Sequence, residues 1–317
     1  MHIETLKIFC DLVETKSFSK TAKLNYLTQS AVSQQIKQLE ERFEKRLVER
    51  GVLTLRPTDA GEAFYKGCRD ILDRYYQLEK LMTAESDVVA GSVKVSAIYS
   101  IGLHELAPFV KQFLRDFPNI SLHVEYARAN RIFDDVCSNM TDLGLVAAPV
   151  KGRRLLSMTP IYADRMVFTC HPKHPLAAKA SVKAADLQDH PMVGFENDIP
   201  TRKLIDRELR KRGVKPDVVM EFDNVETLKG AVEINHGFSI LPLPSVLREV
   251  ASGTLVVKEI KDLHIIRPIY LMHRKDKIFP PAAQKFLDEL NNSIRKLGPE
   301  EEKRGVVPVN AESLVDI

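Results

Sequence analysis

One predicted helix carries side chains of the kinds that read DNA bases. At 100° per residue over residues 28–43, the apolar side chains Val32, Ile36, Leu39 and Phe43 fall within about 60° of one another. The opposite face presents amide, hydroxyl and cationic groups, from Gln29, Ser30, Ser33, Gln34 and Lys37. Glutamine can pair bidentately with adenine, serine with either type of base, and lysine with guanine or a phosphate. This face therefore indicates a recognition helix in a major groove, or else an ordinary solvated helix surface.

A short hairpin is predicted soon after this helix. Residues 50–57 place apolar and β-branched residues around Gly51, a pattern typical of two strands joined by a tight turn. Arg50 and Arg56 would lie on this hairpin. Such cations can bind along the DNA backbone or in the minor groove. The hairpin favours DNA binding over the solvated-surface interpretation.

Two later helix starts could bind a small anion. A strand over residues 93–98 runs into Tyr99 and Ser100 and then a helix, where free backbone N–H groups and the helix dipole favour negative charge. A second start contains Thr201 and Arg202, which could bind a carboxylate or a phosphate. Arg128, after the second strand, is a further candidate. The alternative is that Ser100 and Thr201 only cap helices, Tyr99 only packs, and Arg128 faces solvent.

The sequence gives little support for a metal site or for a catalytic site. Residues 170–174 read CHPKH, but a structural zinc usually needs four ligands in clusters, so an ordinary loop is the better interpretation. The sequence has no GxSxG elbow, phosphate-binding loop or dinucleotide fingerprint. We therefore predict no metal, no cofactor and no enzyme activity. The basic stretch 202–215 is interpreted as a solvated helix face, with contact to DNA or a second subunit as the alternative.

The N-terminal candidates need short helices and one long helix to position them. Residues 1–58 predict short helices, with Ser19 capping the second and Thr28 the third. Residues 59–89 predict a long helix that begins after Thr58 and reaches about residue 86, followed by a hinge. Its apolar residues repeat every 3.5 positions, which suits a partner helix better than a globular core. This dimerisation seam consists of Phe64, Cys68, Ile71, Tyr75, Leu78 and Met82.

The remaining chain alternates strand and helix. Strands are predicted at 93–98, 120–126, 143–147, 166–170 and 192–195, and helices at 103–117, 132–140, 202–212 and 225–235. This alternation predicts parallel, doubly wound sheets, and a length of about 200 residues favours two lobes. The domain would span residues 90–298, and residues 299–317 are predicted to be a flexible tail.

Composition limits the class of protein. The chain has 317 residues, 44 % of them hydrophobic and 28 % charged, with a net charge of +3. These values are ordinary for a soluble globular protein, and no apolar run approaches the ~18 residues of a transmembrane helix. Charges interrupt the apolar N-terminal pattern, so a signal peptide is not expected. Four widely spaced cysteines suit a reducing cytosol, and a cytoplasmic location without a membrane partner is predicted.

The N-terminal motifs resemble the LysR-type transcriptional regulators. The matching stretches are LKIF at 6–9, SFSKTA at 17–22, QSAVSQQIKQLE at 29–40 and LRPTDAG at 55–61. Looser matches follow at 142–145, 174–177, 237–242 and 286–287. Val48 departs from the family pattern, where an aromatic is usual, and Ile98 replaces a small polar residue. The resemblance implies an N-terminal winged helix-turn-helix, a dimerising linker helix, and an α/β effector domain of two Rossmann-like lobes, as in type 2 periplasmic binding proteins.

The resemblance also implies a function. Such a regulator binds double-stranded promoter DNA at an interrupted palindrome as a dimer or tetramer, and it responds to a small effector between its lobes. The helix starts predict that this effector is anionic, and RNA polymerase is a further potential partner. Peroxide sensing by a cysteine pair occurs in the family, but Cys137 and Cys170 have no close pairing in the sequence. The rival interpretation is a solute-binding protein or a small-molecule enzyme on the same two-lobed fold, which leaves residues 1–86 unexplained.

Overall fold

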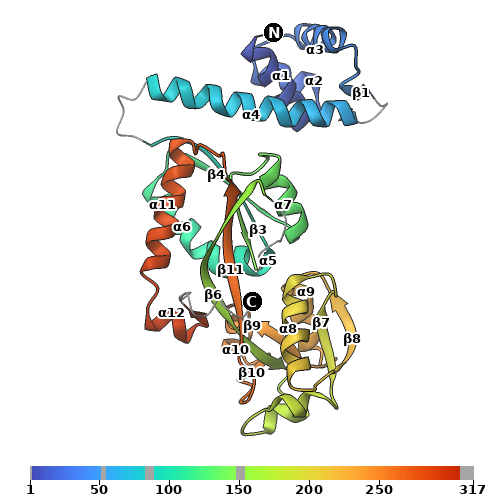
Figure 1. The fold of residues 1–317 in the computed structure, drawn as a ribbon, viewed down its shortest axis with the longest axis vertical. Helices are drawn as coiled ribbons and strands as arrows, with labels where there is room; N and C mark the ends of the chain where they lie inside the picture. The colour runs from blue at the N-terminus through green and yellow to red at the C-terminus, as the bar shows by residue number, and fades with distance from the viewer. Residues whose placement is uncertain (1, 51–54, 83–88, 148–153, 308–317) are drawn as a thin grey trace. The chain divides into compact units, whose positions relative to one another are not determined.

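The computed structural model describes residues 2–50, 55–82, 89–147 and 154–307 (Figure 1). The chain divides into two compact units, one built mainly from the N-terminal residues up to 82 and one from most of the residues after 89. Each unit has its own apolar core. No helix in the described residues is long and apolar enough to span a membrane.

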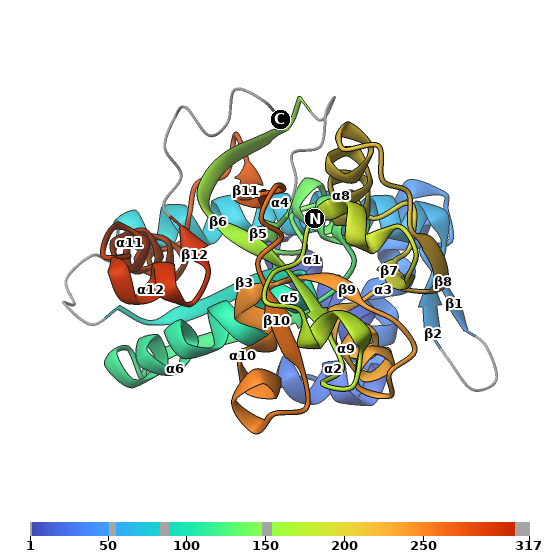
Figure 2. The same cartoon turned by 90° about the horizontal axis from the view of Figure 1, so that it is seen from below.

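The first unit is a bundle of helices with a small hairpin. Its elements are α1 (Ile3–Thr15), α2 (Phe18–Leu24), α3 (Gln29–Phe43), β1 (Val48–Arg50), β2 (Leu55–Pro57) and α4 (Asp59–Met82). The predicted helix-turn-helix is confirmed, and β1 pairs antiparallel with β2 beside it in Figure 2, with the first strand beginning at Val48 rather than Arg50. The predicted tight turn at Gly51 lies outside the described residues.

Short polar side chains decide where these helices begin. The Thr28 hydroxyl accepts a hydrogen bond from the Ala31 N–H at 3.2 Å, and the Thr58 hydroxyl accepts one from the Gly61 N–H at 3.0 Å, so both predicted caps are confirmed. The predicted Ser19 cap is wrong. Ser17 has the extended backbone of a cap (φ −150°), and its hydroxyl accepts from the Lys20 N–H at 3.3 Å.

The long helix α4 serves two environments along its length. Cys68 is 1 % exposed and packs with Leu72 in the core of the first unit. The Phe64 ring lies 5.1 Å from those of Phe9 and Phe43. These two seam residues were predicted to face a partner, and they instead complete the unit's own core. Further along, Ile71 and Leu78 are 48 % and 58 % exposed, while the Met82 side chain lies outside the described residues.

The second unit contains a mixed sheet in the order β10-β6-β11-β5-β3-β4. Its strands are β3 (Gly91–Ala97), β4 (Ile120–Tyr126), β5 (Leu143–Val146), β6 (Leu156–Cys170), β9 (Ser239–Pro242), β10 (Val256–Lys258), β11 (Ile265–Arg274) and β12 (Val306–Val307). β3 runs parallel to β4 and β5, whereas β6 runs antiparallel to β9, β10, β11 and β12. A separate parallel pair joins β7 (Pro191–Phe195) to β8 (Asp217–Phe222).

Two lobes share the long strands β6 and β11. Ile161 and Ile269 belong to the core of the first lobe, whereas Phe168 and Ile265 belong to the core of the second. The expectation of wholly parallel sheets is therefore wrong. Residues 166–170, predicted as a separate strand, are the end of a strand that begins at Leu156, because one antiparallel pair runs through both lobes.

Helices and helical turns cover the strands of both lobes. They are α5 (Tyr99–Ile101), the π-helical turn η1 (Gly102–Leu106), α6 (Ala107–Asp116), α7 (Ala129–Cys137), η2 (Pro175–Ala178), η3 (Ala184–Leu187), α8 (Pro200–Lys211), α9 (Val225–Glu233), α10 (Leu243–Ser252), α11 (Pro281–Arg295) and α12 (Pro299–Lys303).

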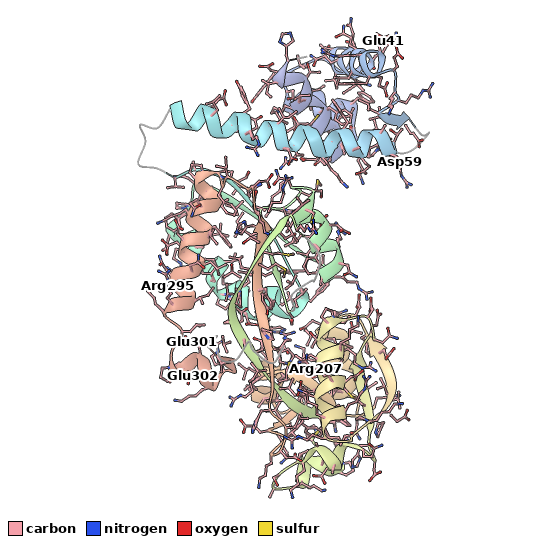
Figure 3. All side chains as sticks on the ribbon, in the orientation of Figure 1. Glu41, Asp59, Arg207, Arg295, Glu301 and Glu302 are labelled. Atoms are coloured by element: carbon pink, nitrogen blue, oxygen red, sulfur yellow. The ribbon has the colours of Figure 1, made fainter. Side chains whose placement is uncertain are left out.

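The first part of the predicted flexible tail is ordered. The Glu301 carboxylate accepts from the Gly298 N–H at 3.0 Å and starts α12, on which Figure 3 labels Glu301 and Glu302. β12 then pairs with β6, Val306 opposite Asp164. Val306 also packs against the first lobe's apolar core, and this contact stabilises the folded form of the charged segment. Residues 308–317 of the predicted tail lie outside the described residues.

Candidate functional site

The recognition face, Gln29, Ser30, Ser33, Gln34 and Lys37, lies on the solvent side of α3. All of these residues are exposed except Ser33, which is partly buried. On the opposite side Val32 and Ile36 are fully buried, and Leu39 is nearly so. Phe43 departs from the predicted stripe, because its side chain remains 40 % exposed. The buried stripe anchors α3 and leaves most of the polar face exposed to solvent.

Local contacts orient the ends of this face. The Ser19 hydroxyl, at the start of α2, donates to the side-chain amide oxygen (Oε1) of Gln29 at 3.1 Å. The Lys37 ammonium lies 3.5 Å from the Glu41 carboxylate, and both side chains are mostly exposed. An exposed pair of this kind is weak, so Lys37 can exchange Glu41 for a phosphate at little cost. Ser19 was predicted only as a cap, and its place beside Gln29 adds it to the candidate surface.

A carboxylate ties the hairpin to the recognition helix. The Glu40 Oε1 accepts hydrogen bonds from the backbone N–H groups of Leu47 at 2.8 Å and Val48 at 3.1 Å. In the hairpin Arg56 is exposed and lies opposite Glu49. The Arg50 side chain lies outside the described residues, although its backbone belongs to β1. The hairpin therefore places Arg56 on a support that is fixed to α3.

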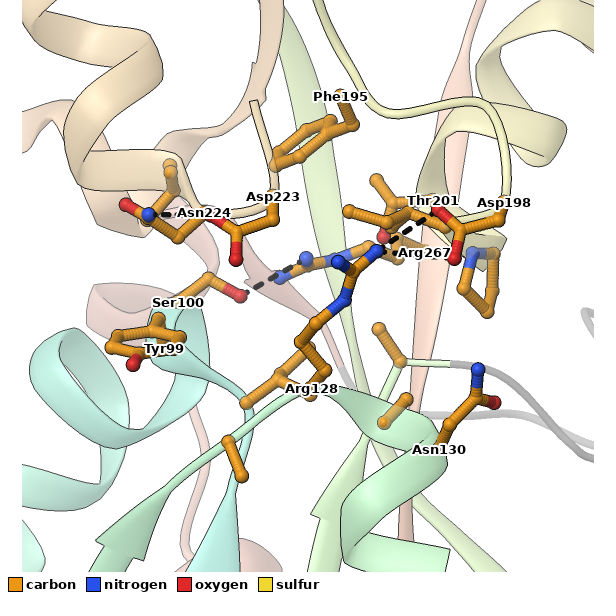
Figure 4. A pocket seen from close by; sticks show the side chains of 17 residues that line it. Tyr99, Ser100, Arg128, Asn130, Phe195, Asp198, Thr201, Asp223, Asn224 and Arg267 are labelled. Atoms are coloured by element: carbon orange, nitrogen blue, oxygen red, sulfur yellow. Dashed lines mark hydrogen bonds and ion pairs between the residues drawn. The ribbon is translucent and has the colours of Figure 1, made fainter. Parts of the chain in front are cut away.

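The second unit holds a cleft between its lobes (Figure 4). The cavity is about 70 Å³, and residues at the starts of α5, α7, α8 and α9 line it. The predicted residues Tyr99, Ser100, Arg128 and Thr201 all line it. Ser100 and Thr201 are 6 % and 3 % exposed. Helix starts direct unpaired N–H groups and positive dipole ends outward, so their convergence favours an anion.

Arg128 bridges the two lobes across this cleft. Its guanidinium donates to Glu196 at 2.8 Å and to Asp198 at 3.0 Å, both on the second lobe (Figure 4 shows the Asp198 contact). Asp223 also lines the cleft. A ligand anion would therefore compete with carboxylates of the protein for Arg128.

Arg267 was not predicted and lies at the base of the cleft. It is 1 % exposed, donates to the Ser100 hydroxyl at 3.1 Å, and forms a paired contact with Asp164. A buried guanidinium with a carboxylate partner is a strong electrostatic feature. Its signal in the sequence is an arginine inside the apolar run IIRPIYLM, where a strand would otherwise be buried on both faces.

Arg202 does not line the cleft, and its predicted role is wrong. Its Nη1 donates at 2.6 Å to the Phe195 carbonyl and to the Glu221 carboxylate, and its Nε donates to Asp206 at 2.9 Å. The helix start points Thr201 into the cleft. The next side chain is rotated by about 100° and pairs with Asp206, one turn along α8, and with β8.

The cysteine and histidine stretch forms an ordinary loop. The His171 Nδ1 accepts from the Lys173 N–H at 3.0 Å and the His174 Nδ1 from the Leu176 N–H at 3.2 Å. Burial raises the pKa of the Cys170 thiol to about 11, so it is almost wholly protonated at neutral pH and a poor nucleophile. Among the described residues no cluster of three or more histidine, cysteine or acidic side chains could hold a metal ion.

Comparison with known proteins agrees with this division into two units. Residues 3–62 match the family model of the bacterial regulatory helix-turn-helix protein, lysR family, and residues 86–295 match that of the LysR substrate binding domain. The HTH-type transcriptional regulator CysL of Bacillus subtilis is 29 % identical over 265 residues, which covers 84 % of this chain and 87 % of CysL.

Solved structures share the fold. A full-length OxyR variant from Pseudomonas aeruginosa superimposes with a TM-score of 0.76 at 22 % identity, covering 94 % of this chain and 96 % of that one. Full-length CbnR, solved with its target DNA, gives a TM-score of 0.65 at 18 % identity over 92 % of this chain and 100 % of that one. Together with the family models, these likenesses show that the chain belongs to the LysR family of DNA-binding transcriptional regulators with an effector-binding domain.

Proposed function

We propose that two copies of this chain bind an interrupted palindrome in promoter DNA, each placing its recognition face in the major groove of one half-site. The observation that carries the proposal is the mostly exposed polar face of α3, opposite the buried side chains of Val32, Ile36 and Leu39. Paired copies related by a two-fold axis match paired half-sites. The exposed apolar side chains Ile71 and Leu78 on α4 support pairing through that helix.

The hairpin adds affinity rather than sequence preference. Arg56 is exposed on β2, and Glu40 fixes the hairpin to α3. An arginine in this position can bind a phosphate or enter the minor groove, neither of which identifies one base pair uniquely.

The cleft of the second unit is proposed to bind a small organic or inorganic anion as effector. Ser100, Thr201 and the converging helix starts support the anionic group. Asp198 and Asp223 favour an effector that also carries a hydrogen-bond donor. An anion that takes Arg128 from Glu196 and Asp198 would loosen the bridge between the lobes.

Loosening the Arg128 bridge would alter the contact between the two lobes, and this change would link effector binding to DNA binding. An effector that changes DNA affinity must have its own affinity changed by DNA to the same extent. Where the response is activation, contact with RNA polymerase would follow as a further step. The proposal contains no catalytic reaction.

The test begins by recovering genomic fragments that the purified protein retains and locating a shared interrupted palindrome. Fluorescence anisotropy then measures affinity for that duplex and for a scrambled one at several salt concentrations. We expect affinity to fall steeply with salt on both duplexes, because phosphate contacts release counterions, and to remain higher on the palindrome. Equal binding to both duplexes, or binding that is insensitive to salt, would contradict the proposal.

A further inference from the structure

A second and larger cavity lies in the second unit and shares no lining residue with the cleft. Its volume is about 600 Å³, and residues of η1, α6, β6, α11, α12 and β12 line it. Part of the wall is apolar and aromatic, and the rest carries polar and charged side chains. The apolar part consists of Leu106, Phe109, Phe113, Ile161, Leu290, Ile294 and Val306. A cavity with such walls suits an apolar molecule of small size.

One acidic side chain reaches this cavity without a complete set of partners. Glu105 of η1 lines the cavity, and its Oε2 atom is buried without a hydrogen-bond partner. Tyr162, which also lines the cavity, and Asp164 lie within side-chain hydrogen-bonding reach of Glu105, and the Asp164 Oδ1 atom is likewise buried without a partner. A buried carboxylate oxygen without a partner is costly, so this atom is a position where a ligand group would be stabilised.

Arg267 is the cation near Glu105, but it is already paired with Asp164. Asp164 is fully buried, and Arg267 is already paired with it and hydrogen-bonded to Ser100. One guanidinium thus faces two carboxyl groups, and burial together with Asp164 raises the pKa of Glu105 well above its usual value. A cation beside Glu105 would pair with its ionised form and so displace the proton that this environment retains.

The remaining ionisable residues of the lining also favour a cation. The acids are Glu105, Asp116, Glu289 and Glu301, the cationic side chains are Lys296 and Arg304, and His104 is paired with Glu226 at 2.7 Å. Glu289 lies 2.9 Å from Lys285, and Asp116 is exposed and accepts hydrogen bonds from the Gln112 amide. Glu105 is therefore the acid with a carboxyl oxygen buried at the cavity, whereas Asp116 lies at its exposed outer part.

We propose that this cavity is a second small-molecule site, which takes an apolar amine with its ammonium group beside Glu105 and its carbon skeleton among the aromatic and aliphatic walls. The site is joined to the effector cleft by a line of buried groups. Glu105 faces Asp164, Asp164 is paired with Arg267, and Arg267 donates to Ser100 in the cleft. Occupation of one site therefore changes the charge that the other one experiences.

The experiment uses the full chain and phenethylamine as the probe, with phenethyl alcohol as its neutral analogue. Because the sequence contains no tryptophan, Phe109→Trp places a single indole in the cavity wall. We expect phenethylamine to change the fluorescence of this variant and to bind at least tenfold more tightly than the alcohol. Glu105→Gln should weaken amine binding about tenfold or more, since a charge-assisted contact is lost, and should bring the amine and the alcohol to similar affinities.

Two control variants separate this site from other sources of binding. Asp116→Asn removes the same charge from the outer part of the cavity and should change amine affinity less than threefold. Thr201→Val alters the cleft and should leave amine affinity unchanged. The proposal is overturned if the amine and the alcohol bind Phe109→Trp equally, if millimolar amine leaves its fluorescence unchanged, or if Asp116→Asn weakens binding as much as Glu105→Gln.

Discussion

Gln34 of α3 is proposed to read a base. Its side chain is exposed at the middle of the recognition face, while its neighbours Val32 and Ile36 are buried. We expect Gln34→Ala to cost about 1–3 kcal/mol on the preferred duplex and to relax the preference for one base pair. Anisotropy titrations on the preferred duplex and on duplexes changed at one position would measure both effects.

Arg56→Ala is the matched comparison for this prediction. Arg56 is exposed on β2. Its loss should weaken binding to all duplexes by a similar factor and reduce the dependence of affinity on salt. If Arg56→Ala changes base preference and Gln34→Ala does not, the assignment of the two surfaces is reversed.

Glu105 predicts a pH dependence of stability. Burial and the neighbouring Asp164 raise the pKa of Glu105 in the folded chain, although Arg267 and Tyr162 oppose this. The folded state then holds a proton that the unfolded state releases between its own pKa, about 4.3, and the raised value. The free energy of unfolding should therefore fall as pH rises through this window.

The variant Glu105→Gln should remove this fall in the free energy of unfolding with rising pH. Urea unfolding near pH 7 should show the variant more stable than the unmodified protein by about 1 kcal/mol, and the two should agree near pH 4. Glu289→Gln, which also lines the cavity, is the control and should keep the pH dependence of the unmodified protein. A stability gain for Glu105→Gln that is equal at both pH values would contradict the protonation argument.

The sequence predicted several residues that line the cleft, but it did not predict Arg267 at the base of the cleft. Tyr99, Ser100, Arg128 and Thr201 could be found because they follow strands or begin helices, positions that meet at one edge of a sheet. Arg267 could not be assigned in this way. It lies within β11, and its contacts with Asp164 and Ser100 come from residues 103 and 167 positions away.

At the scale of elements, α4 is buried in one part and exposed in another, and we propose that the exposed part pairs with a second copy. Leu78 is 58 % exposed, whereas Cys68 is buried in the first unit's core. We expect Leu78→Asp to weaken dimer formation at least tenfold, because it places a charge on an apolar contact surface. Cys68→Ala should retain the dimer and lower the free energy of unfolding by about 1 kcal/mol, as for other small losses of core volume.

Sedimentation velocity over a range of concentrations and thermal unfolding would distinguish the two effects. Ala63→Asp is the control, because Ala63 is exposed on the first half of the same helix. This variant should leave both association and stability nearly unchanged. If Leu78→Asp leaves the dimer unchanged, the end of α4 does not belong to the dimer interface.

Helical periodicity predicted α4 but not its two environments. A repeat of 3.5 residues shows that one stripe of a helix is buried against something. The packing partners of Phe64 are Phe9 and Phe43, and only the folded arrangement of α1 and α3 beside α4 brings these rings together. For the same reason the extent of β6 was missed, since its partner β11 lies about 100 residues further along the chain.

At the scale of the whole molecule, the C-terminal segment secures the long strands. Arg165 of β6 donates its backbone N–H to the Gly305 carbonyl at 2.8 Å, and Val306 pairs with Asp164. A chain ending after Leu297 should unfold roughly 2–6 °C lower, given the loss of one strand pairing and a small apolar contact. It should also lose phenethylamine binding, because α12 and β12 line the second cavity.

A chain ending after Val307 is the matched control in calorimetry. It retains α12 and β12 and should therefore keep both the thermal midpoint and amine binding. Equal behaviour of the two truncated chains would show that α12 and β12 contribute neither stability nor a cavity wall.

The order of the domains, the helix-turn-helix with its polar face, and the alternation of strand and helix could all be predicted from the sequence. These depend on caps, turns and apolar periodicity, which act between residues close together in the chain. Tertiary structure alone decided that Phe64 and Cys68 face inward, that Arg202 leaves the cleft, and that Arg267 enters it. Residues far apart in the chain meet there, and burial and charge pairing select the partner only after the backbone has brought them together.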